Sequence, residues 1–321
     1  VQAEAVQAEA VQAEAVQAEV PAEVVDKESA QEAKESEAAS QQSAEVQSEG
    51  GSGEPESVSA IIARDKYIKL DFEELRQIGI LTPHVPRSAV AEEFRTIKRP
   101  LLKNITGDES SDPIKNGNLV MVTSALEGDG KTFTSVSLAI SMAMEQDKTV
   151  LFVDADTAKA EAGRVLGIPS DCPGLIDVLE DDRTNLSDVI LRTNMEKLRI
   201  LPAGDLHTHA NELLASEKMH QLMVEMSEFY SDRVIVFDSP PLLLTTEASV
   251  LANFMGQIVF VVSADMTPQY AVLQAIEHIG EDTMVGMVLN RARRGVNPYY
   301  YTYGEILYGY GRNRQTGVEA G

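Results

Sequence analysis

The run Leu119-Val-Met-Val-Thr-Ser-Ala125-Leu-Glu127-Gly-Asp-Gly-Lys131-Thr132 decides how this chain folds. Its first five residues form an apolar run of strand length, and a helical pattern follows from Thr132 to Glu145. A glycine-rich turn between strand and helix lets backbone N–H groups approach phosphate oxygens, and the helix N-terminus adds the positive end of its dipole. The run therefore predicts a nucleotide-binding loop of the G-x-x-x-x-G-K-[ST] type, with Ala125 in place of the first glycine.

The loop residues define the expected ATP site. Its members are Glu127, Gly128, Asp129, Gly130, Lys131, Thr132 and Phe133. Lys131 is expected to reach the β- and γ-phosphates, and the Thr132 hydroxyl is expected to ligate Mg²⁺. ATP and Mg²⁺ are therefore the expected cofactors.

Strand-like and helix-like segments follow one another along the chain. Strands are expected at Leu119–Thr123, Thr149–Asp154, Leu198–Pro202, Val234–Asp238, Ile258–Ser263 and Met284–Asn290. Helices are expected at Asp71–Ile80, Ser88–Leu102, Thr132–Glu145, Asn211–Tyr230, Thr246–Met255 and Pro268–Ile279. Near-continuous apolar strands that alternate with helices are typical of a mostly parallel sheet covered by helices on both faces. The expected fold class is α/β, of the P-loop NTPase type.

Two of the expected strands end in aspartates. Asp154 and Asp156 close the second strand, and Asp238 closes the fourth. In a parallel sheet the carboxyl ends of the strands lie at one edge, where ligands bind in such folds. Mg²⁺ prefers oxygen ligands, so we expect Thr132, Asp156 and Asp238 to hold it directly or through water.

The N-terminal segment has the composition of a disordered tail. Residues 1–20 repeat Val-Gln-Ala-Glu-Ala nearly four times, and residues 1–57 hold 14 acidic and 2 basic side chains, a net charge of −12 in a chain of −24. A segment without aromatic residues buries too little apolar surface to offset the entropy of ordering it. Its charge argues against binding nucleic acid or anionic lipid.

Cysteine usage and hydropathy indicate a cytoplasmic protein. The single cysteine, Cys172, excludes an internal disulfide and is typical of a reducing cytosol. The apolar runs are of strand length, whereas a membrane span needs about 18 residues. The N-terminal repeat also lacks the basic and apolar regions of a signal peptide. We expect the chain to reach the membrane only through a partner.

Six of the nine tyrosines lie near the C-terminus. They are Tyr299, Tyr300, Tyr301, Tyr303, Tyr308 and Tyr310. Asn297, Pro298 and several glycines interrupt the segment, so an exposed, flexible tail is expected. A phosphoryl-donor site and a cluster of acceptor hydroxyls on one chain indicate a kinase that phosphorylates its own tail. The 13 residues from Asn290 to Tyr303 extend to at most about 45 Å, so their length is compatible with transfer within one chain.

Together these residues resemble the bacterial tyrosine kinases of capsule and exopolysaccharide systems, the BY-kinases. The Lys131 loop matches the family's Walker A loop, Asp154 and Asp156 its second Asp-x-Asp box, and Asp238 its Walker B aspartate. The resemblance implies an ATP-dependent protein-tyrosine autokinase that regulates polysaccharide polymerisation and export. It implies catalytic roles for Lys131, Asp154 and Asp156 and an adenine contact for Asn290, for which a turn residue is the alternative interpretation. Because a carboxylate is a far weaker base than tyrosinate, we expect Asp154 to act mainly by orienting the tyrosine hydroxyl.

A helix before the loop resembles the family's Glu-x-x-Arg-x-x-Arg oligomerisation motif. It reads Glu92, Arg95 and Lys98 here, with lysine in place of the last arginine. The resemblance implies a ring-like homo-oligomer in which phosphoryl transfer runs between subunits. A solvated helix with mixed charges is the alternative interpretation.

The family resemblance covers about Ser88 to Tyr310 and also implies partners. The chain is most similar to the autokinases linked to exosortase-type exopolysaccharide loci, whose kinase is separate from its membrane protein. The expected partners are a membrane chain-length-determinant or co-polymerase protein that activates the kinase, and a tyrosine phosphatase. Recruitment to the inner face of the plasma membrane follows from the first of these.

Two other classes of protein remain open at this stage. A partitioning or septum-positioning ATPase of the same fold is the main alternative, but Leu126 stands at the place of its signature lysine. A scaffold that uses ATP only to assemble is the second, and the intact metal set disfavours it. The chain also departs from the BY-kinases at Ala158, where the family often has arginine. Lys159 follows, but lysine does not reproduce a bidentate arginine fork.

The expected organisation has four parts. A disordered acidic tail covers 1–57, and a helical preamble with the oligomerisation helix covers 58–117. The P-loop kinase core follows over 118–292, and the Tyr/Gly-rich autophosphorylation tail over 293–321.

Overall fold

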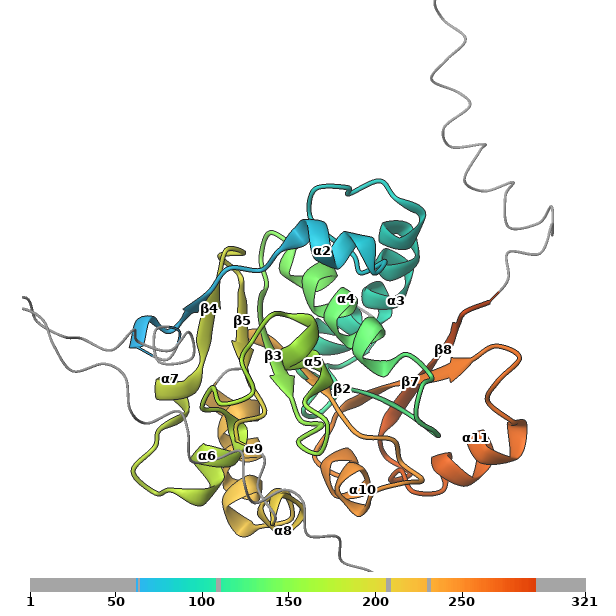
Figure 1. The fold of residues 1–321 in the computed structure, drawn as a ribbon. Coiled ribbons are helices and arrows are strands. Elements are labelled where there is room, and N and C mark those ends of the chain that lie inside the picture. The colour runs from blue at the N-terminus through green and yellow to red at the C-terminus, as the bar shows by residue number, and fades with distance from the viewer. Residues whose placement is uncertain (1–61, 63, 108–110, 206–208, 230–231, 293–321) are drawn as a thin grey trace, which may run out of the picture. The chain divides into compact units, whose positions relative to one another are not determined.

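The computed structural model describes residues 62, 64–107, 111–205, 209–229 and 232–292 (Figure 1). The predicted acidic tail over 1–57 and the predicted tyrosine tail over 293–321 lie outside the described residues. No helix among the described residues is both long enough and apolar enough to cross a membrane.

An eight-stranded sheet forms the centre of the fold, in the order β1-β4-β5-β3-β6-β2-β7-β8. All neighbouring strands are parallel except the antiparallel pair β4 and β5. The strands are β1 (Tyr67–Ile68), β2 (Leu119–Ser124), β3 (Thr149–Asp154), β4 (Leu191–Thr193), β5 (Leu198–Leu201), β6 (Arg233–Asp238), β7 (Gln257–Ser263) and β8 (Met284–Asn290). The predicted mostly parallel sheet is confirmed.

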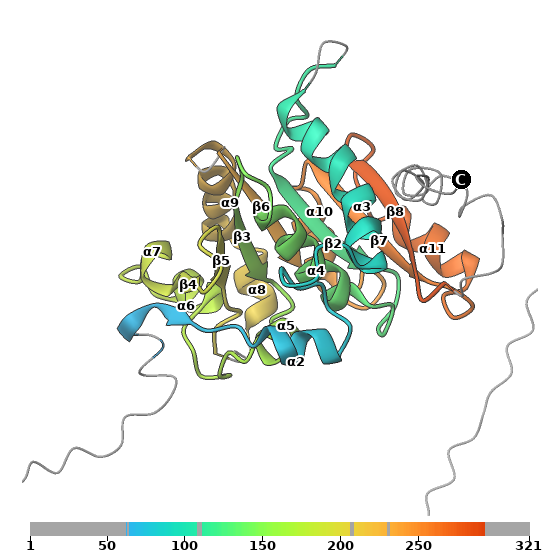
Figure 2. The same cartoon turned by 90° about the horizontal axis from the view of Figure 1, so that it is seen from above.

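Helices cover both faces of this sheet, as Figures 1 and 2 show. One face carries α2 (Phe72–Gln77), α3 (Ala89–Thr106), α4 (Lys131–Ala143) and α5 (Glu161–Val165). The other face carries α6 (Leu175–Glu180), α7 (Leu186–Val189), α8 (Ala210–Leu214), α9 (Glu217–Phe229), α10 (Thr246–Ala252) and α11 (Gln269–Ile276). The doubly covered sheet follows from strands that are apolar on both sides.

Strand β2 shows how one sequence serves both faces. All six of its residues are buried. Successive side chains of a strand point to opposite faces. Accordingly Val120 and Val122 pack under α3 and α4, whereas Leu119 and Met121 pack against the helices of the other face.

The six predicted strands are all present, but two short strands, the three short helices α5, α6 and α7, and one helix break were not predicted. Strands β1 and β4 pair with each other and extend the sheet beyond β5, so the preamble contributes a strand as well as its helices. The predicted single helix over Asn211–Tyr230 is two helices, α8 and α9. The break falls where the Ser216 hydroxyl accepts a hydrogen bond from the Met219 N–H at 3.2 Å, a helix-capping contact.

Candidate active site

The predicted nucleotide loop joins β2 to α4 and has the backbone of a phosphate cradle. Gly128 and Gly130 adopt φ angles of 79° and 97°, which only glycine takes without strain. A Cβ atom on Gly130 would also collide with the Asn290 side-chain nitrogen. No side chain caps the first turn of α4. The N–H groups of this turn are therefore available to bind an anion. Lys131 occupies the first helical position, is 8% exposed and adds a positive charge there.

Contacts from Thr267, which follows β7, and from Asn290 at the end of β8 hold the loop in place. Asp129 is buried, and its carboxylate accepts hydrogen bonds from the Leu126 N–H at 3.2 Å and from the Thr267 hydroxyl at 2.6 Å. The Asn290 amide nitrogen donates to the Asp129 carbonyl at 2.9 Å. Asn290 therefore supports the loop in this structure, and the adenine contact implied by the resemblance stays a prediction. Thr267 follows β7 without any motif, so the sequence did not reveal it.

Phe133 belongs to the core more than to the site. Its ring packs against Phe94 of α3 with centroids 6.1 Å apart. Any contribution to phosphate binding therefore comes from its backbone N–H. The six predicted phosphoacceptor tyrosines lie outside the described residues.

Three carboxylates meet beside the loop, as predicted. Asp154 and Asp238 are direct register partners on the neighbouring strands β3 and β6. The Thr132 hydroxyl donates to Asp238 Oδ2 at 2.8 Å, and the Gly163 N–H donates to Asp154 Oδ2 at 2.9 Å. Asp156, 7% exposed, lies two residues beyond Asp154. The site thus concentrates negative charge within reach of Lys131, whose ammonium interacts with Asp156 and Asp238.

Burial is the main cause of the electrostatic properties of these groups. Burial, reinforced by Asp238, raises the pKa of Asp154 well above its ordinary value. Burial also raises the pKa of Asp156, against the opposing effect of Lys131. For Asp238, burial raises the pKa to about 7, although the Thr132 hydrogen bond and Lys131 lower it. Lys131 therefore offsets only part of the cost of charging these carboxylates, and a bound cation would lower their pKa values further.

The residues present fit Mg²⁺ bound together with a nucleotide. The Oδ1 atoms of Asp154 and Asp238 are buried and have no hydrogen-bond partner among the described residues. Such orphaned carboxylate oxygens are costly unless a ligand satisfies them. No cluster of three or more His, Cys, Asp or Glu side chains in the described part of the chain forms a complete metal cage. In nucleotide sites Mg²⁺ takes one or two carboxylates together with substrate phosphates and water.

A first prediction concerns the pH dependence of stability in the metal-free protein. Asp238 has an ordinary pKa of 3.8 and a folded-state pKa of about 7. The folded protein therefore keeps a proton that the unfolded chain releases between these values, so stability falls as the pH rises from about 4 to about 7. The expected loss is on the order of 2–4 kcal/mol, or about 4–12 °C in Tm. Calorimetry across this pH range measures it.

The control for this prediction is a pair of variants. Asp238→Asn removes the titrating group and should flatten the decline, whereas Asp282→Asn, at an exposed position, should leave it intact. Saturating Mg²⁺ and nucleotide should also restore stability above pH 7. A Tm of the wild-type protein that rises from pH 5 to pH 7 without ligand would contradict the assignment.

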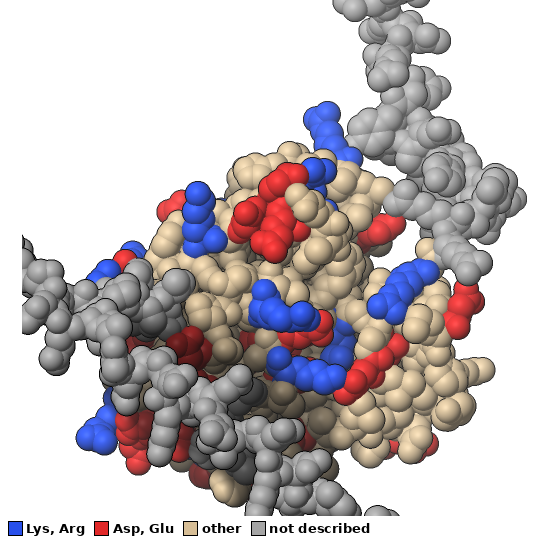
Figure 3. Space-filling model, viewed as in Figure 1, with Lys and Arg blue, Asp and Glu red and all other residues tan. Residues whose placement is uncertain are grey.

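An ion pair closes one side of the loop. Lys159 Nζ lies 2.7 Å from the Glu127 carboxylate, and both side chains are about half exposed. Figure 3 shows basic and acidic side chains gathered around a hollow in the middle of this face. Because lysine presents a single flexible ammonium, the pair can open without disturbing the fold. Lys159 thus contacts the nucleotide loop even though it does not reproduce the arginine of the family.

The predicted oligomerisation residues separate into two groups. Glu92 and Arg95 form an ion pair on the exposed side of α3, and Arg95 also donates to the Pro86 carbonyl at 2.6 Å. Lys98 is 6% exposed, and its ammonium lies 2.7 Å from the Ser141 carbonyl and 2.6 Å from the Glu145 carboxylate. Lys98 therefore braces α3 against the end of α4. Its role as a subunit contact stays a prediction.

The similarities to known proteins agree with this site. Residues 118–281 match a family described as an AAA domain. The chain is also 30% identical over 223 residues to the putative tyrosine-protein kinase CapB of Staphylococcus aureus. This alignment covers 68% of this chain and 92% of CapB. The chain belongs to the bacterial tyrosine-protein kinases. The predicted family and enzyme class are thus confirmed, and the partitioning-ATPase alternative is correspondingly less supported.

Further relatives of this kinase show the same pattern. The tyrosine-protein kinase YwqD of Bacillus subtilis is 28% identical over 230 residues, with 71% of this chain and 92% of YwqD covered. The crystal structure of the chimerical protein CapA2B2 aligns with a TM-score of 0.57 and 25% identity, over 70% of this chain and 93% of that chain. Some relatives are longer. The kinase matches 37% of the putative tyrosine-protein kinase EpsB of Ralstonia nicotianae and 30% of the tyrosine-protein kinase etk of Escherichia coli.

Proposed function

We propose that this kinase transfers the γ-phosphoryl group of ATP to the tyrosines of its own C-terminal tail, Tyr299–Tyr310. The observation that carries the proposal is the convergence of Lys131, Asp154 and Asp238 at one sheet edge, in a chain with six clustered tyrosines. Phosphoryl transfer needs mainly positioning and neutralisation of charge, which this edge supplies.

Each residue of the edge has a distinct role in the proposal. The free N–H groups at the start of α4 and the Lys131 ammonium bind the β- and γ-phosphates. Thr132, Asp156 and Asp238 hold Mg²⁺, directly or through water. When bound, Mg²⁺ neutralises charge that develops on the phosphate oxygens. Asp154 orients the acceptor hydroxyl towards the γ-phosphate and stabilises its proton as it leaves.

The proposed setting is a homo-oligomer that exchanges tails between subunits. Tail residues 291–321 contain five arginines and two glutamates, a net charge of +3. Each phosphotyrosine adds about −1.5 to −2 charges, so several of them would reverse that sign and make neighbouring tails repel. Phosphorylation would then open the assembly, and a tyrosine phosphatase would restore it.

The proposed biological role is regulation of exopolysaccharide or capsule polymerisation and export. The names of the relatives support a tyrosine kinase, and the similar protein CapA2B2 is a chimera, which is compatible with a kinase of this type that works with a second polypeptide. A membrane co-polymerase protein is the proposed activator, which would recruit this kinase from the cytoplasm to the inner face of the membrane. Nucleic acid is not among the proposed partners.

The central experiment is direct. Purified protein is incubated with ATP and Mg²⁺, and the phosphorylated positions are located by mass spectrometry of proteolytic peptides. The expected result is phosphate on two or more of the six tail tyrosines. Brisk ATP hydrolysis stimulated by DNA or lipid, without any phosphotyrosine, would favour the partitioning ATPase instead.

A second prediction tests the contact surface formed by Glu92 and Arg95. One exposed ion pair is worth only about 0–1 kcal/mol, but a contact repeated around a ring accumulates such losses. Glu92→Ala combined with Arg95→Ala is expected to shift the unphosphorylated protein to smaller species and to slow autophosphorylation, while ATP affinity is kept. Light scattering measures the mass.

The chain offers a matched control for this surface. Glu73 and Arg76 on α2 form another exposed ion pair with the same spacing of three residues. The double alanine variant of that pair should keep the wild-type mass. If the Glu92/Arg95 variant also keeps it, the α3 surface is a solvated flank of the core and not an interface.

A further inference from the structure

Strand β8 (Met284–Asn290) is an edge of the sheet that lacks the usual protection. It pairs with β7 on one side, and among the described residues no strand pairs with its other side (Figures 1 and 2). Met284, Met287 and Leu289 are 49%, 57% and 62% exposed, and the strand contains no charged residue and no proline. Natural proteins usually guard such an edge with charges, prolines or a cover, because its unpaired N–H and C=O groups can pair with another strand. The β8 edge is therefore a site for strand addition.

An apolar groove of about 300 Å³ lies between α3 and this edge. Helix α3 contributes Ile97, Pro100 and Leu101 to its lining, and β8 contributes Met284 and Val288. Successive side chains of a strand point to opposite faces, so a strand added to β8 would place every second side chain over this groove. Aromatic side chains suit it, since each of them buries a large apolar area.

The tail of the same chain has the sequence and the length to cover this edge. It follows directly from Asn290, the last residue of β8, and residues 291–298 include Gly295 and Asn297-Pro298, which favour a turn. Residues 299–303 read Tyr-Tyr-Tyr-Thr-Tyr, all of them types that favour strands. The seven residues of β8 span about 23 Å, and residues 299–310 extend to about 40 Å. The tail can therefore turn back and run antiparallel along the whole of β8.

Charge and tethering favour the tail over other occupants of the edge. Glu277, Glu281 and Asp282 are exposed and precede β8. A tail antiparallel to β8 runs towards these carboxylates and brings Arg312 and Arg314 near them. The acidic segment 1–57, with its net charge of −12, would be repelled there. A second copy of β8 would have to compete with a tethered segment, whose effective concentration is about millimolar for a short linker.

We propose that the unphosphorylated tail of this kinase docks on the β8 edge of its own chain, with residues 299–303 as an added antiparallel strand. The backbone N–H and C=O groups of the tail pair with those on the open side of β8. Alternate side chains of the added strand cover the groove beside α3, and the others lie on the opposite face of the sheet. The exposed apolar side chains of β8 are thereby covered.

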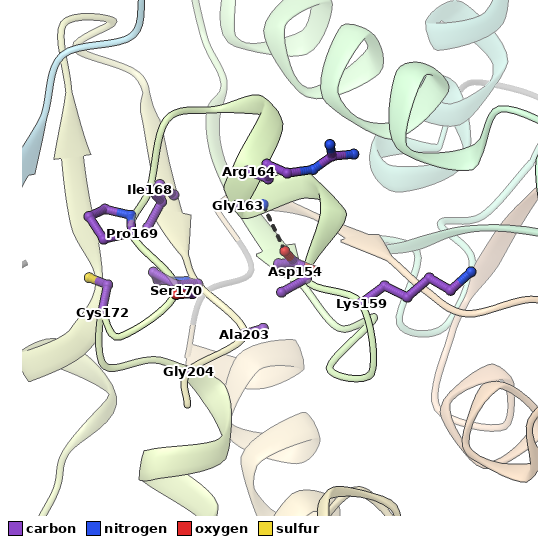
Figure 4. A pocket seen from close by; sticks show the side chains of 12 residues that line it. Asp154, Lys159, Gly163, Arg164, Ile168, Pro169, Ser170, Cys172, Ala203 and Gly204 are labelled. Carbon is purple, nitrogen blue, oxygen red and sulfur yellow. Dashed lines mark hydrogen bonds between the residues drawn. The ribbon is translucent and has the colours of Figure 1, made fainter. Parts of the chain in front are cut away.

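Docking keeps the tyrosines away from the active site of their own subunit. Asp154 and Lys159 line the cavity of that site (Figure 4). Asp154 ends β3, and the strands β6, β2 and β7 separate β3 from β8, a distance of about 19 Å at the usual strand spacing. The docked tail is thus a resting state that must be released before transfer. A phosphotyrosine adds about −1.5 to −2 charges, which would disfavour a return to this apolar edge beside Glu281 and Asp282. This consequence rests on the proposed function, whereas the docking itself does not.

Hydrogen–deuterium exchange of the unphosphorylated full chain, without nucleotide, tests the docking. The slowest amides of residues 299–305 are expected to exchange at least tenfold more slowly than in a synthetic peptide of residues 293–310, because pairing with β8 protects them. Met287→Lys combined with Leu289→Lys places two charges on the edge and should return the exchange to the rate of the peptide. Both positions are exposed, so the fold is kept, and circular dichroism checks it.

Tyr67→Lys combined with Val224→Lys is the matched control. These side chains are 41% and 42% exposed and belong to β1 and α9, so the variant should keep the protection of the tail. Exchange of the wild-type tail at the rate of the peptide would overturn the docking. Protection that survives the two lysines on β8 would overturn the β8 site. Protection that appears only as the protein concentration rises, with a doubled mass in light scattering, would assign the edge to a second copy. None of these measurements uses ATP, so their failure is distinct from a failure of the kinase assignment.

Discussion

Lys131→Met is expected to abolish autophosphorylation while the protein stays folded. The ammonium of Lys131 is the cation nearest the phosphates in the proposed site, and methionine matches its length without its charge. Loss of one preorganised group that stabilises transition-state charge typically costs about 10²–10³-fold in rate. Incorporation of labelled phosphate from ATP measures the loss, and circular dichroism checks the fold.

A matched control distinguishes charge at the site from charge in general. Lys148 lies in the loop after α4, at the end of that helix opposite the phosphates. Lys148→Met should keep at least half of the wild-type rate. Strong labelling of Lys131→Met itself would remove the kinase assignment of this site.

Replacement of all six tail tyrosines by phenylalanine is expected to remove nearly all phosphotyrosine and to leave ATP affinity unchanged. Phenylalanine keeps the ring and deletes only the acceptor oxygen, so any loss reports on the chemistry. Mass spectrometry counts the remaining sites, and calorimetric titration with Mg²⁺ and nucleotide reports affinity.

Two exposed tyrosines elsewhere provide the control. Tyr67 and Tyr270 are 41% and 71% exposed. Tyr67→Phe combined with Tyr270→Phe should leave labelling at the wild-type level, because neither belongs to the tail. Persistent labelling of the six-phenylalanine variant at Tyr270 would mean that exposure, and not membership of the tail, selects the acceptor.

The sequence predicts the centre of this fold better than its periphery, for a physical reason. The six predicted strands are each at least four residues long, and all but the edge strand β8 are mostly buried, so their apolar pattern is visible without any knowledge of their neighbours. Strands β1 and β4 have two and three residues, and only their pairing with each other and of β4 with β5 identifies them. Serine is a common helix N-cap residue, so Ser216 marks the break between α8 and α9 in the sequence. The helical pattern continues on both sides of Ser216, and for that reason a single helix was predicted.

The same division applies to the site. Lys131, Thr132 and Asp238 follow from local motifs, and the structure brings them together as expected. Thr267 and Lys98 act through contacts across 138 and 43 residues of sequence, which no spacing rule reveals. For Lys98 the spacing with Glu92 and Arg95 did not reveal its burial, because a spacing of six residues carries a side chain around the helix from the exposed side to the core. A motif fixes residue types, and packing decides which way each one faces.

The place where the chain leaves the sheet has a mechanical consequence. Asn290 is the last residue of β8, and its side chain holds the carbonyl of Asp129 in the nucleotide loop. The tail begins three residues later. When a neighbouring molecule binds the tail and pulls on it, the force reaches the sheet at Asn290. It then acts on the hydrogen bond between Asn290 and the Asp129 carbonyl. The tail that carries the tyrosines and the phosphate loop are therefore mechanically coupled through Asn290, so that a force on the tail also acts on the loop.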